Sequence, residues 1–155
     1  MAELESLYRA RFDRFAAVAA AITGEGESGR DAVQTGFAIA VRERGSFRRE
    51  GALEAWLWRI VVNEAKRLRR EPTHLPLDEP FEAATNGQGP GDELGVRAFL
   101  AALPERQRAA VFLRYHADLD YRQISEILDV EVGTVSATLS AAHTTLRKSL
   151  GKAAR

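Results

Sequence analysis

Residues 103–150 read LPERQRAAVFLRYHADLDYRQISEILDVEVGTVSATLSAAHTTLRKSL, and their pattern decides the fold. Pro104 opens a first helix, because proline has a preset φ and no amide hydrogen to lose at the first helical position. Asp120 can cap a second helix, with Gln123 three residues on as in a capping box. After a break at residues 129–133, a third helix carries apolar residues at helical spacing. These residues are Val135, Leu139, Ala142, Leu146 and Leu150.

Two short helices, a tight turn and a longer helix with one apolar seam predict a helix-turn-helix, whose second helix enters the DNA major groove. No strand pattern is evident along the sequence, so the predicted fold class is all-α. Small helical bundles that do not bind DNA also contain short amphipathic helices. The function therefore has to be argued from the remaining residues.

The composition bounds the class of protein. A chain of 155 residues makes one medium domain or two small ones. It contains no cysteine, which excludes disulfides and thiolate metal sites. No apolar run approaches the roughly 18 residues of a membrane span, and the charged N-terminus lacks the apolar core of a signal peptide. We therefore expect a cytoplasmic protein with no membrane span, no cofactor and no metal site.

Charge is unevenly distributed along the chain, although the net charge is zero. Residues 1–70 carry 13 Lys and Arg against 10 Asp and Glu, a net charge of +3. Residues 94–155 carry 9 against 6, also +3, whereas residues 71–93 carry 6 acidic residues and no Lys or Arg, a net charge of −6. Because two mildly basic ends flank an acidic connector, the zero net charge does not exclude nucleic acid as a partner.

Three amphipathic helices are predicted before the connector. The first covers residues 3–22 and is followed by three closely spaced glycines, which we expect to break it. The second covers residues 30–44 and the third covers residues 52–70. Residues 71–91 contain all but one of the prolines, which predicts a flexible acidic linker. The predicted organisation is a helical domain at 1–70, a linker at 71–92 and a helix-turn-helix domain at 93–155.

The third predicted helix has two faces. Apolar residues such as Leu57 and Val61 form a core stripe, which Glu64 interrupts; pairing with a buried arginine is the one explanation that we can offer. Trp56 borders both this stripe and the opposite face, and Trp58 lies about 200° from Trp56 around the helix, so one face cannot hold both tryptophans. The opposite face carries Arg59, Asn63, Lys66 and Arg70. Positive charge with one amide and one aromatic fits a surface that engages a nucleic-acid strand, although charge alone is equally typical of a solvated face.

These pieces, in this order, resemble bacterial RNA polymerase sigma factors, especially the compact extracytoplasmic-function (ECF) group. The C-terminal part resembles region 4 of the family through LPERQR, FLRY, the Tyr-x-x-Ile-x-x-Ile-Leu run, GTV and LRKSL. The N-terminal part resembles region 2 through DAVQTGFAIAVRE at 31–43 and WLWRIVVNEAKRLRR at 56–70. The resemblance implies a transcription initiation factor that binds core RNA polymerase and promoter DNA and is not an enzyme.

The resemblance also assigns site residues in the first domain. The second helix would dock on the clamp of the polymerase largest subunit through Asp31, Gln34 and Phe37, although Phe37 also belongs to the apolar stripe of that helix. Thr35-Gly36 departs from the family, which usually has an acid followed by an aliphatic residue, and glycine inside a helix costs about 1 kcal/mol relative to alanine. The loop at 45–51 and the third helix would bind the melted minus-10 element, since aromatic faces stack on bases and arginine contacts phosphate. The minus-10 residues would be Phe47, Arg48, Arg49, Trp56, Arg59, Asn63, Lys66 and Arg70.

In the second domain, the resemblance implies binding to the double-stranded minus-35 element. The residues would be Arg122, Thr134, Ser136, Thr138, Ser140, His143 and Arg147. The family usually carries several basic residues in the recognition helix, whereas residues 134–145 read TVSATLSAAHTT without a fixed positive charge. Hydroxyls can bond phosphates and base edges, but the counterion-release term needs Lys or Arg. We therefore expect this domain to bind DNA weakly by itself. Asp129 stands where the turn often has glycine, and Asp tolerates left-handed φ.

Three other functions compete with that of a sigma factor. The scattered histidines show no metalloprotease spacing, nucleophile elbow or partner cysteine, which argues against catalysis. A stand-alone helix-turn-helix regulator would explain residues 93–155 but not the N-terminal helices. A sigma-like decoy that sequesters an anti-sigma factor stays open because of Thr35-Gly36 and the charge-poor recognition helix. An anti-sigma factor is also a candidate partner of a working sigma factor.

Overall fold

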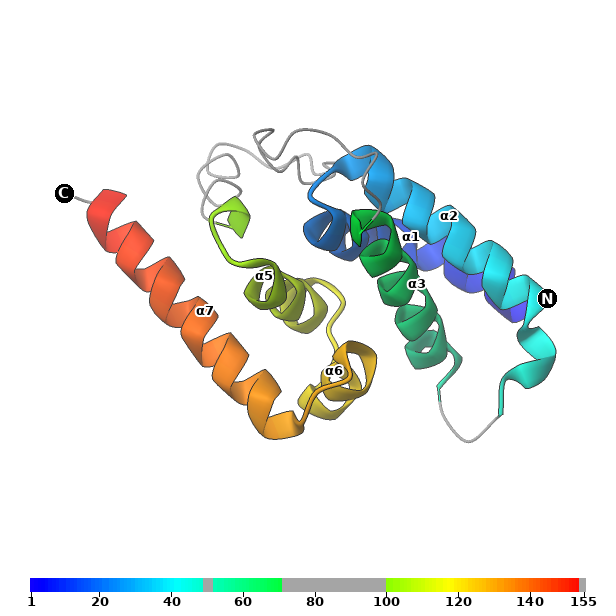
Figure 1. Ribbon diagram of the computed structural model, residues 1–155. Coiled ribbons are helices and arrows are strands. Elements are labelled where there is room, and N and C mark those ends of the chain that lie inside the picture. The colour runs from blue at the N-terminus through cyan, green and yellow to red at the C-terminus, as the bar shows by residue number, and fades with distance from the viewer. Residues whose placement is uncertain (49–51, 71–99, 154–155) are drawn as a thin grey trace.

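A computed structural model describes residues 1–48, 52–70 and 100–153 of the chain, and every element in this part is helical. Figure 1 shows two groups of helices side by side, and the predicted all-α class is confirmed. The predicted linker at 71–92 lies outside the described residues. The N-terminal group consists of α1 (Ala2–Thr23), α2 (Gly26–Arg42), the 3-10 turn η1 (Arg44–Ser46) and α3 (Leu53–Arg70). The C-terminal group consists of α5 (Glu105–Val111), the π-helical segment η2 (Phe112–His116), α6 (Tyr121–Leu128) and α7 (Val132–Ala153).

Helices α1, α2 and α3 form a bundle around buried aromatic side chains. Trp58 is fully buried and stacks on Phe15, with 4.0 Å between the ring centroids. Phe37 meets Phe15 edge to face at 5.3 Å. The predicted core stripe of α3 is confirmed at Leu57 and Val61, but burial also includes Trp58. Large aromatic rings dominate the energetics of a small core, so these contacts fix the bundle.

The helix break predicted at the three glycines is only partly correct. Gly24 ends α1 with a φ of 86°, but α2 begins at Gly26 and includes Gly29. A Cβ at Gly29 would lie 2.6 Å from the backbone nitrogen of Ala20 on α1. Glycine here allows two helices to approach more closely than a side chain would permit, so it is part of the packing and does not break the helix.

Gly36 has a similar role where α2 crosses α3. It is buried, and a Cβ there would lie 2.9 Å from Cγ2 of Val61. Close packing of the two backbones therefore offsets the low helix propensity of glycine. The departure at Thr35-Gly36 places the glycine in the core and leaves Thr35 exposed.

The C-terminal helices confirm the predicted helix-turn-helix. The Asp120 carboxylate accepts a hydrogen bond from the Gln123 backbone amide at 2.8 Å, and the Gln123 side chain accepts one from the Asp120 amide at 3.0 Å. Asp129 ends α6 with a φ of 56°, the left-handed conformation expected of it. Helix α7 begins at Val132, inside the break predicted over residues 129–133.

The end of the first helix in this motif was not predicted. Residues Phe112–His116 form a π-helical segment, in which the Ala117 amide donates to the Phe112 carbonyl at 3.0 Å. Such segments are rare and frequently lie at functional sites. Within η2, Leu113 is fully buried and Tyr115 is exposed, so this segment contributes one side chain to the core and one to the surface.

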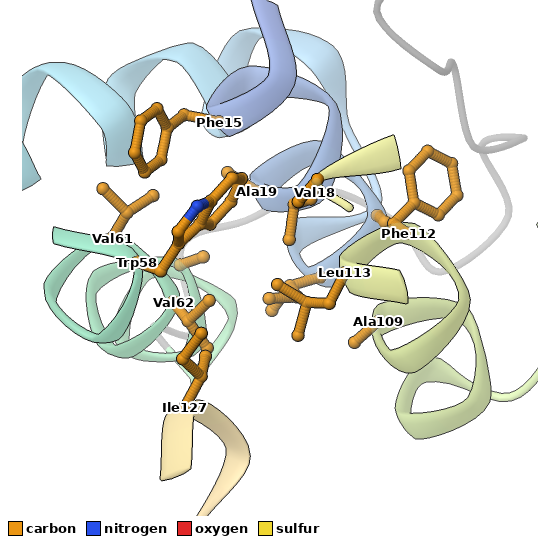
Figure 2. Close-up of a cluster of buried hydrophobic side chains, with 14 of the residues drawn as sticks. Phe15, Val18, Ala19, Trp58, Val61, Val62, Ala109, Phe112, Leu113 and Ile127 are labelled. Carbon is orange, nitrogen blue, oxygen red and sulfur yellow. The ribbon is translucent and has the colours of Figure 1, made fainter. Parts of the chain in front are cut away.

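The two groups of helices share one hydrophobic core. Helices α5 and η2 pack on α1, and α6 packs on α3. Figure 2 shows Val18 and Val62 of the first group together with Leu113 and Ile127 of the second, and all four are buried. In this structure each group completes the core of the other.

Candidate nucleic-acid interface

The polar stripe of α3 lies on the outer face of the N-terminal bundle. Arg59 and Asn63 are exposed, and Lys66 beside them is half-buried. Residues spaced i, i+4 and i+7 share one face because each helical residue turns by about 100°. Arg70 ends the helix, and its side chain lies outside the described part of the chain. The structure therefore brings three of the four predicted stripe residues together on one surface.

The loop before α3 adds an aromatic pair to this surface. Phe47 follows η1, and its ring centroid lies 5.3 Å from that of Trp56 with a 45° angle between the planes. Both side chains are half-buried, and Arg48 beside them is exposed. Arg49 lies outside the described residues. Aromatic rings flanked by arginine offer stacking faces and phosphate contacts to a nucleic-acid strand.

Glu64, which interrupts the apolar stripe of α3, is 7% exposed. Its carboxylate accepts a hydrogen bond from Nε of Arg67 at 2.9 Å. The side chain of Arg67 is 54% exposed, so the partner is an arginine as suggested but not a buried one. This pairing explains how a carboxylate is tolerated at the rim of the core.

A cleft of about 620 Å³ is lined by residues of α3 and α6. Phe47, Trp56 and Arg59 line one side, and Arg122 and Glu126 line the other. Nη2 of Arg59 donates to the backbone carbonyl of Glu126 at 3.2 Å, and the Glu126 carboxylate lies 3.6 Å from Nε of Arg122. The structure thus places a residue predicted for the minus-35 element beside residues predicted for the minus-10 element.

The recognition helix α7 exposes part of its predicted set on one face. Ser136, Ser140 and Arg147 are exposed at spacings that bring them together. His143 borders them, and its Nε2 lies 2.9 Å from the hydroxyl oxygen of Tyr115. This face carries hydroxyls, an imidazole and one fixed positive charge, which suits polar contacts to a DNA groove.

Thr134 and Thr138 lie on the other side of α7. The Thr138 hydroxyl donates to the Thr134 carbonyl at 2.7 Å, and both residues are half-buried. They line a groove toward α5 together with Arg106 and Gln107. The seven residues predicted for the minus-35 element therefore do not form one surface, because these two threonines and Arg122 face elsewhere.

The outer face of α2 carries two of the three residues predicted to bind core polymerase. Asp31 and Gln34 are exposed, three residues apart on neighbouring turns. Phe37 is 6% exposed, and its ring lies 5.0 Å from the Tyr8 ring inside the bundle. We therefore correct the assignment of Phe37 from a polymerase contact to a core residue that holds α2 in place.

Three charged residues between the helix groups had no role in the sequence-based assignment. Nε of Arg108 donates to the Ala21 carbonyl at 2.6 Å, and Arg69 forms an ion pair with Glu105. Burial lowers the pKa of the Arg108 guanidinium, the Arg69 charge acts in the same direction, and Glu105 opposes both. Arg108 belongs to the LPERQR motif, but nothing in its spacing indicates a contact with a helix that is distant in sequence.

The described residues were searched for groups that could bind a metal ion and for helices that could span a membrane. Their His, Asp and Glu side chains do not gather in groups able to hold a metal ion. None of the helices in the described ranges has the length and apolar character that a membrane span requires. His116 is the last residue of η2.

Two family models match the two halves of the chain. The model for Sigma-70 region 2 matches residues 7–73, and the model for Sigma-70, region 4 matches residues 94–146. The ECF RNA polymerase sigma factor SigM of Mycobacterium tuberculosis is 31% identical over 150 residues, which cover 95% of this chain and 76% of that relative. The chain belongs to the ECF sigma factors. It is a transcription initiation factor, and its partners are core RNA polymerase and promoter DNA.

Other comparisons agree with this family. The ECF RNA polymerase sigma-E factor of Haemophilus influenzae is 36% identical over 127 residues, 70% of this sigma factor and 67% of that relative. The sigma factor RpoE in complex with the anti-sigma factor NepR from Bartonella quintana has a TM-score of 0.79 at 22% identity, over 97% of this chain and 98% of that one. CnrH in complex with the cytosolic domain of CnrY has a TM-score of 0.73 at 21% identity, over 96% and 88%. Both likenesses cover the two helix groups of this sigma factor and show a shared fold.

Proposed function

We propose that this sigma factor directs core RNA polymerase to promoters by binding the melted minus-10 element with its N-terminal helices and the minus-35 element with α7. The observation that carries the proposal is the α3 surface, where Arg59 and Asn63 adjoin the Phe47–Trp56 pair. Arginine attracts phosphate, an amide can pair with a base edge, and aromatic rings stack on unpaired bases. This combination suits a melted strand, because the bases of a closed duplex present no free face.

The other two surfaces support the same function. Ser136, Ser140 and Arg147 on α7 fit groove contacts through hydroxyls, but one fixed charge on that face supplies little counterion-release energy. The helix therefore depends on polymerase to hold it at the minus-35 element. Asp31 and Gln34 on α2 supply an exposed polar face for docking on core polymerase. We place this action in the cytoplasm, where polymerase and promoter DNA meet.

Transcription from a promoter library, with core polymerase and this protein, tests the proposal. The wild-type protein should initiate at a restricted set of promoters that share minus-35 and minus-10 sequences. Arg59→Ala should weaken initiation at all of them, because arginine supplies phosphate attraction that is independent of sequence. The matched control Arg9→Ala, on an exposed turn of α1, should leave initiation unchanged. Circular dichroism of both variants checks folding, and equal activity of the two folded variants would contradict the assignment of α3.

An inhibitory protein partner is the second part of the proposal. The similar structures of RpoE and CnrH contain the anti-sigma factor NepR and the cytosolic domain of CnrY. We infer that this chain also has an anti-sigma partner. A decoy would bind such a partner without supporting initiation, and a stand-alone regulator would bind duplex DNA tightly without polymerase. The transcription assay therefore separates a working sigma factor from both alternatives.

A further inference from the structure

The FLRY run that ends at Tyr115 contains one side chain that neither the core nor the proposed contacts use. Its two apolar residues, Phe112 and Leu113, are buried. Nη1 of Arg114 donates to the Leu119 carbonyl at 3.0 Å. Tyr115 is 61% exposed, more than any other aromatic side chain in the described part of the chain. Single exposed rings are common on protein surfaces, so the case for a function depends on how this ring is held.

The π-helical turn places the Tyr115 ring outside the core. Residues three and four apart share one face of an α-helix, so a regular helix would put Tyr115 on the face of Phe112 and Val111. Both of these residues are 8% exposed. In η2 the Ala117 amide donates to the Phe112 carbonyl five residues back, and this wider turn moves Tyr115 off the buried face. A rare backbone conformation thus presents this side chain at the surface.

The exposed ring is held against α7. Its hydroxyl oxygen lies 2.9 Å from Nε2 of His143, and the two ring centroids are 5.7 Å apart with 33° between the planes. At 100° per residue, His143 lies within about 60° of Ser136, Ser140 and Arg147 around the helix, and all four residues are exposed. Tyr115 therefore extends the polar face of α7 with a hydroxyl group from a second element.

The hydrogen bond between Tyr115 and His143 leaves a group free to bind a ligand. A tyrosine hydroxyl has one proton to donate and also accepts hydrogen bonds. It can donate to Nε2, or it can accept from an Nε2–H group and keep its own proton for another acceptor. A DNA phosphate oxygen is negatively charged and accepts strongly, so phosphate favours the second arrangement. Nε2–H then donates to the Tyr115 oxygen while the Tyr115 hydroxyl donates to phosphate.

We propose that the Tyr115 hydroxyl binds a phosphate of the minus-35 duplex and that His143 positions it for this contact. The proposal rests on the α7 face proposed above and adds a residue of η2 to it. It also revises the role of His143, which acts on DNA through the tyrosine. Of the four residues on the α7 face, only Arg147 carries a fixed positive charge. A neutral hydrogen bond to phosphate adds affinity without adding to the counterion-release term.

Tyr115→Phe tests the contact, because it removes the hydroxyl and keeps the ring. The affinity of the full-length protein for a duplex of about 20 base pairs and mixed sequence should fall roughly threefold to tenfold, as expected for one exposed hydrogen bond. The loss should be similar for every sequence, because a phosphate contact carries no base preference. The dependence on salt should stay unchanged, because no charge is removed. Fluorescence anisotropy at low salt measures the affinity.

The matched control is Tyr8→Phe, which removes the same hydroxyl from a half-buried tyrosine of α1 and should leave the affinity unchanged. A double-mutant cycle then tests the role of His143. His143→Ala should weaken binding by a similar factor, and Tyr115→Phe should have little further effect in that background. Urea denaturation of the same proteins measures coupling in the free energy of unfolding. A hydrogen bond that only stabilises the fold would couple the residues in unfolding and leave the DNA affinity unchanged.

An affinity of Tyr115→Phe equal to that of the Tyr8→Phe control would overturn the phosphate contact. So would a loss confined to particular base sequences, because it would indicate a base contact. Additive losses in the double variant would overturn the positioning role of His143.

Arg147→Ala keeps these results apart from the proposed function. If Arg147→Ala weakens duplex binding while Tyr115→Phe matches its control, the tyrosine contact is wrong and the α7 face stands. If Tyr115→Phe weakens binding while Arg147→Ala does not, the tyrosine contact stands and the proposed α7 face fails. If neither variant weakens binding, both assignments are wrong.

Discussion

Helices α3 and α7 are the two helices that we assign to DNA, and they offer it different chemistry. The outer face of α3 carries Arg59, Asn63 and Lys66, whereas α7 exposes Ser136 and Ser140 on the face that we assign to DNA. Their surroundings differ as well, because α6 packs on α3 and one of its carbonyls accepts from Arg59. The charged helix is thus partly covered, and the exposed helix carries little charge. Both arrangements limit the non-specific attraction of free protein to DNA, which depends on accessible Lys and Arg.

The largest effect on the free energy of unfolding should come from the buried faces of α3 and α7, which are both apolar. Trp58→Ala in α3 should destabilise the protein by about 3–5 kcal/mol, and Leu139→Ala in α7 by about 2–5 kcal/mol, because each removes a fully buried side chain. Trp56→Ala should cost only about 1–2 kcal/mol, since that ring is half-buried. Urea denaturation measures all three. A larger loss at Trp56 than at Trp58 would reverse the assignment of the two tryptophans.

The next effect should separate the outward faces. Asn63→Ala should weaken open-complex formation at the preferred promoter by about 1–3 kcal/mol and relax the choice of base there, because an amide can pair with a base edge. Ser140→Ala in α7 should cost less, about 0.5–1.5 kcal/mol, because it removes one hydroxyl hydrogen bond. Open-complex formation on a promoter library measures both. If Asn63→Ala folds normally and leaves promoter choice unchanged, the α3 stripe is only a solvated face.

Adding charge to α7 should make the two helices more alike. Ser136→Lys and Ser140→Lys should each steepen the log–log dependence of duplex DNA affinity on salt by about 0.9, provided that each new charge neutralises one phosphate. The control Ser6→Lys places the same charge on an exposed position of α1 and should change the slope less. Fluorescence anisotropy over a salt series gives the slopes. Equal slopes in all three variants would mean that this face of α7 does not meet DNA.

The smallest effect concerns pH at the boundary between the helix groups. Burial lowers the pKa of His116, the Arg14 charge of α1 acts in the same direction, and Asp13 opposes both. The unfolded chain therefore binds the proton more readily, so stability rises as the pH increases toward the ordinary histidine pKa of about 6.5 and is lost on acidification below it. His116→Gln should flatten this dependence in urea titrations between about pH 5.5 and pH 7.5, whereas Asp13→Asn should strengthen it. An unchanged dependence in His116→Gln would assign it to other groups.

Local side-chain chemistry made most of the helices predictable. The capping box of Asp120 and Gln123 and the left-handed Asp129 involve residues only a few positions apart, and the structure confirms them. Prediction failed where packing between helices decides the conformation. Gly29 lies inside α2 because it approaches α1, and its local sequence carries no sign of that neighbour. The π-helical segment likewise has no local signal that distinguishes it from an ordinary helix end.

In the candidate site, too, local spacing was predictable from the sequence and contacts between distant segments were not. The exposed positions of Arg59 and Asn63 follow from helical spacing, so the sequence was sufficient to place them on one face. The hydrogen bond from Arg59 to Glu126 joins residues that are distant in sequence, and only the packing of α6 on α3 creates it. Phe37 was assigned to polymerase by resemblance, which supplies a role but not the direction of a side chain. Its spacing in the apolar stripe of α2 correctly indicated burial.

Gly36 has a consequence for how this protein can change during evolution. A methyl group at this position would collide with Val61, so the distance between α2 and α3 is set by the absence of a side chain. The outer face of α2 is assigned to polymerase and that of α3 to promoter DNA, so this distance also aligns the two macromolecules with each other. A larger residue at position 36 would need a smaller side chain at position 61 or a wider separation of the two helices, so we expect these two positions to change together.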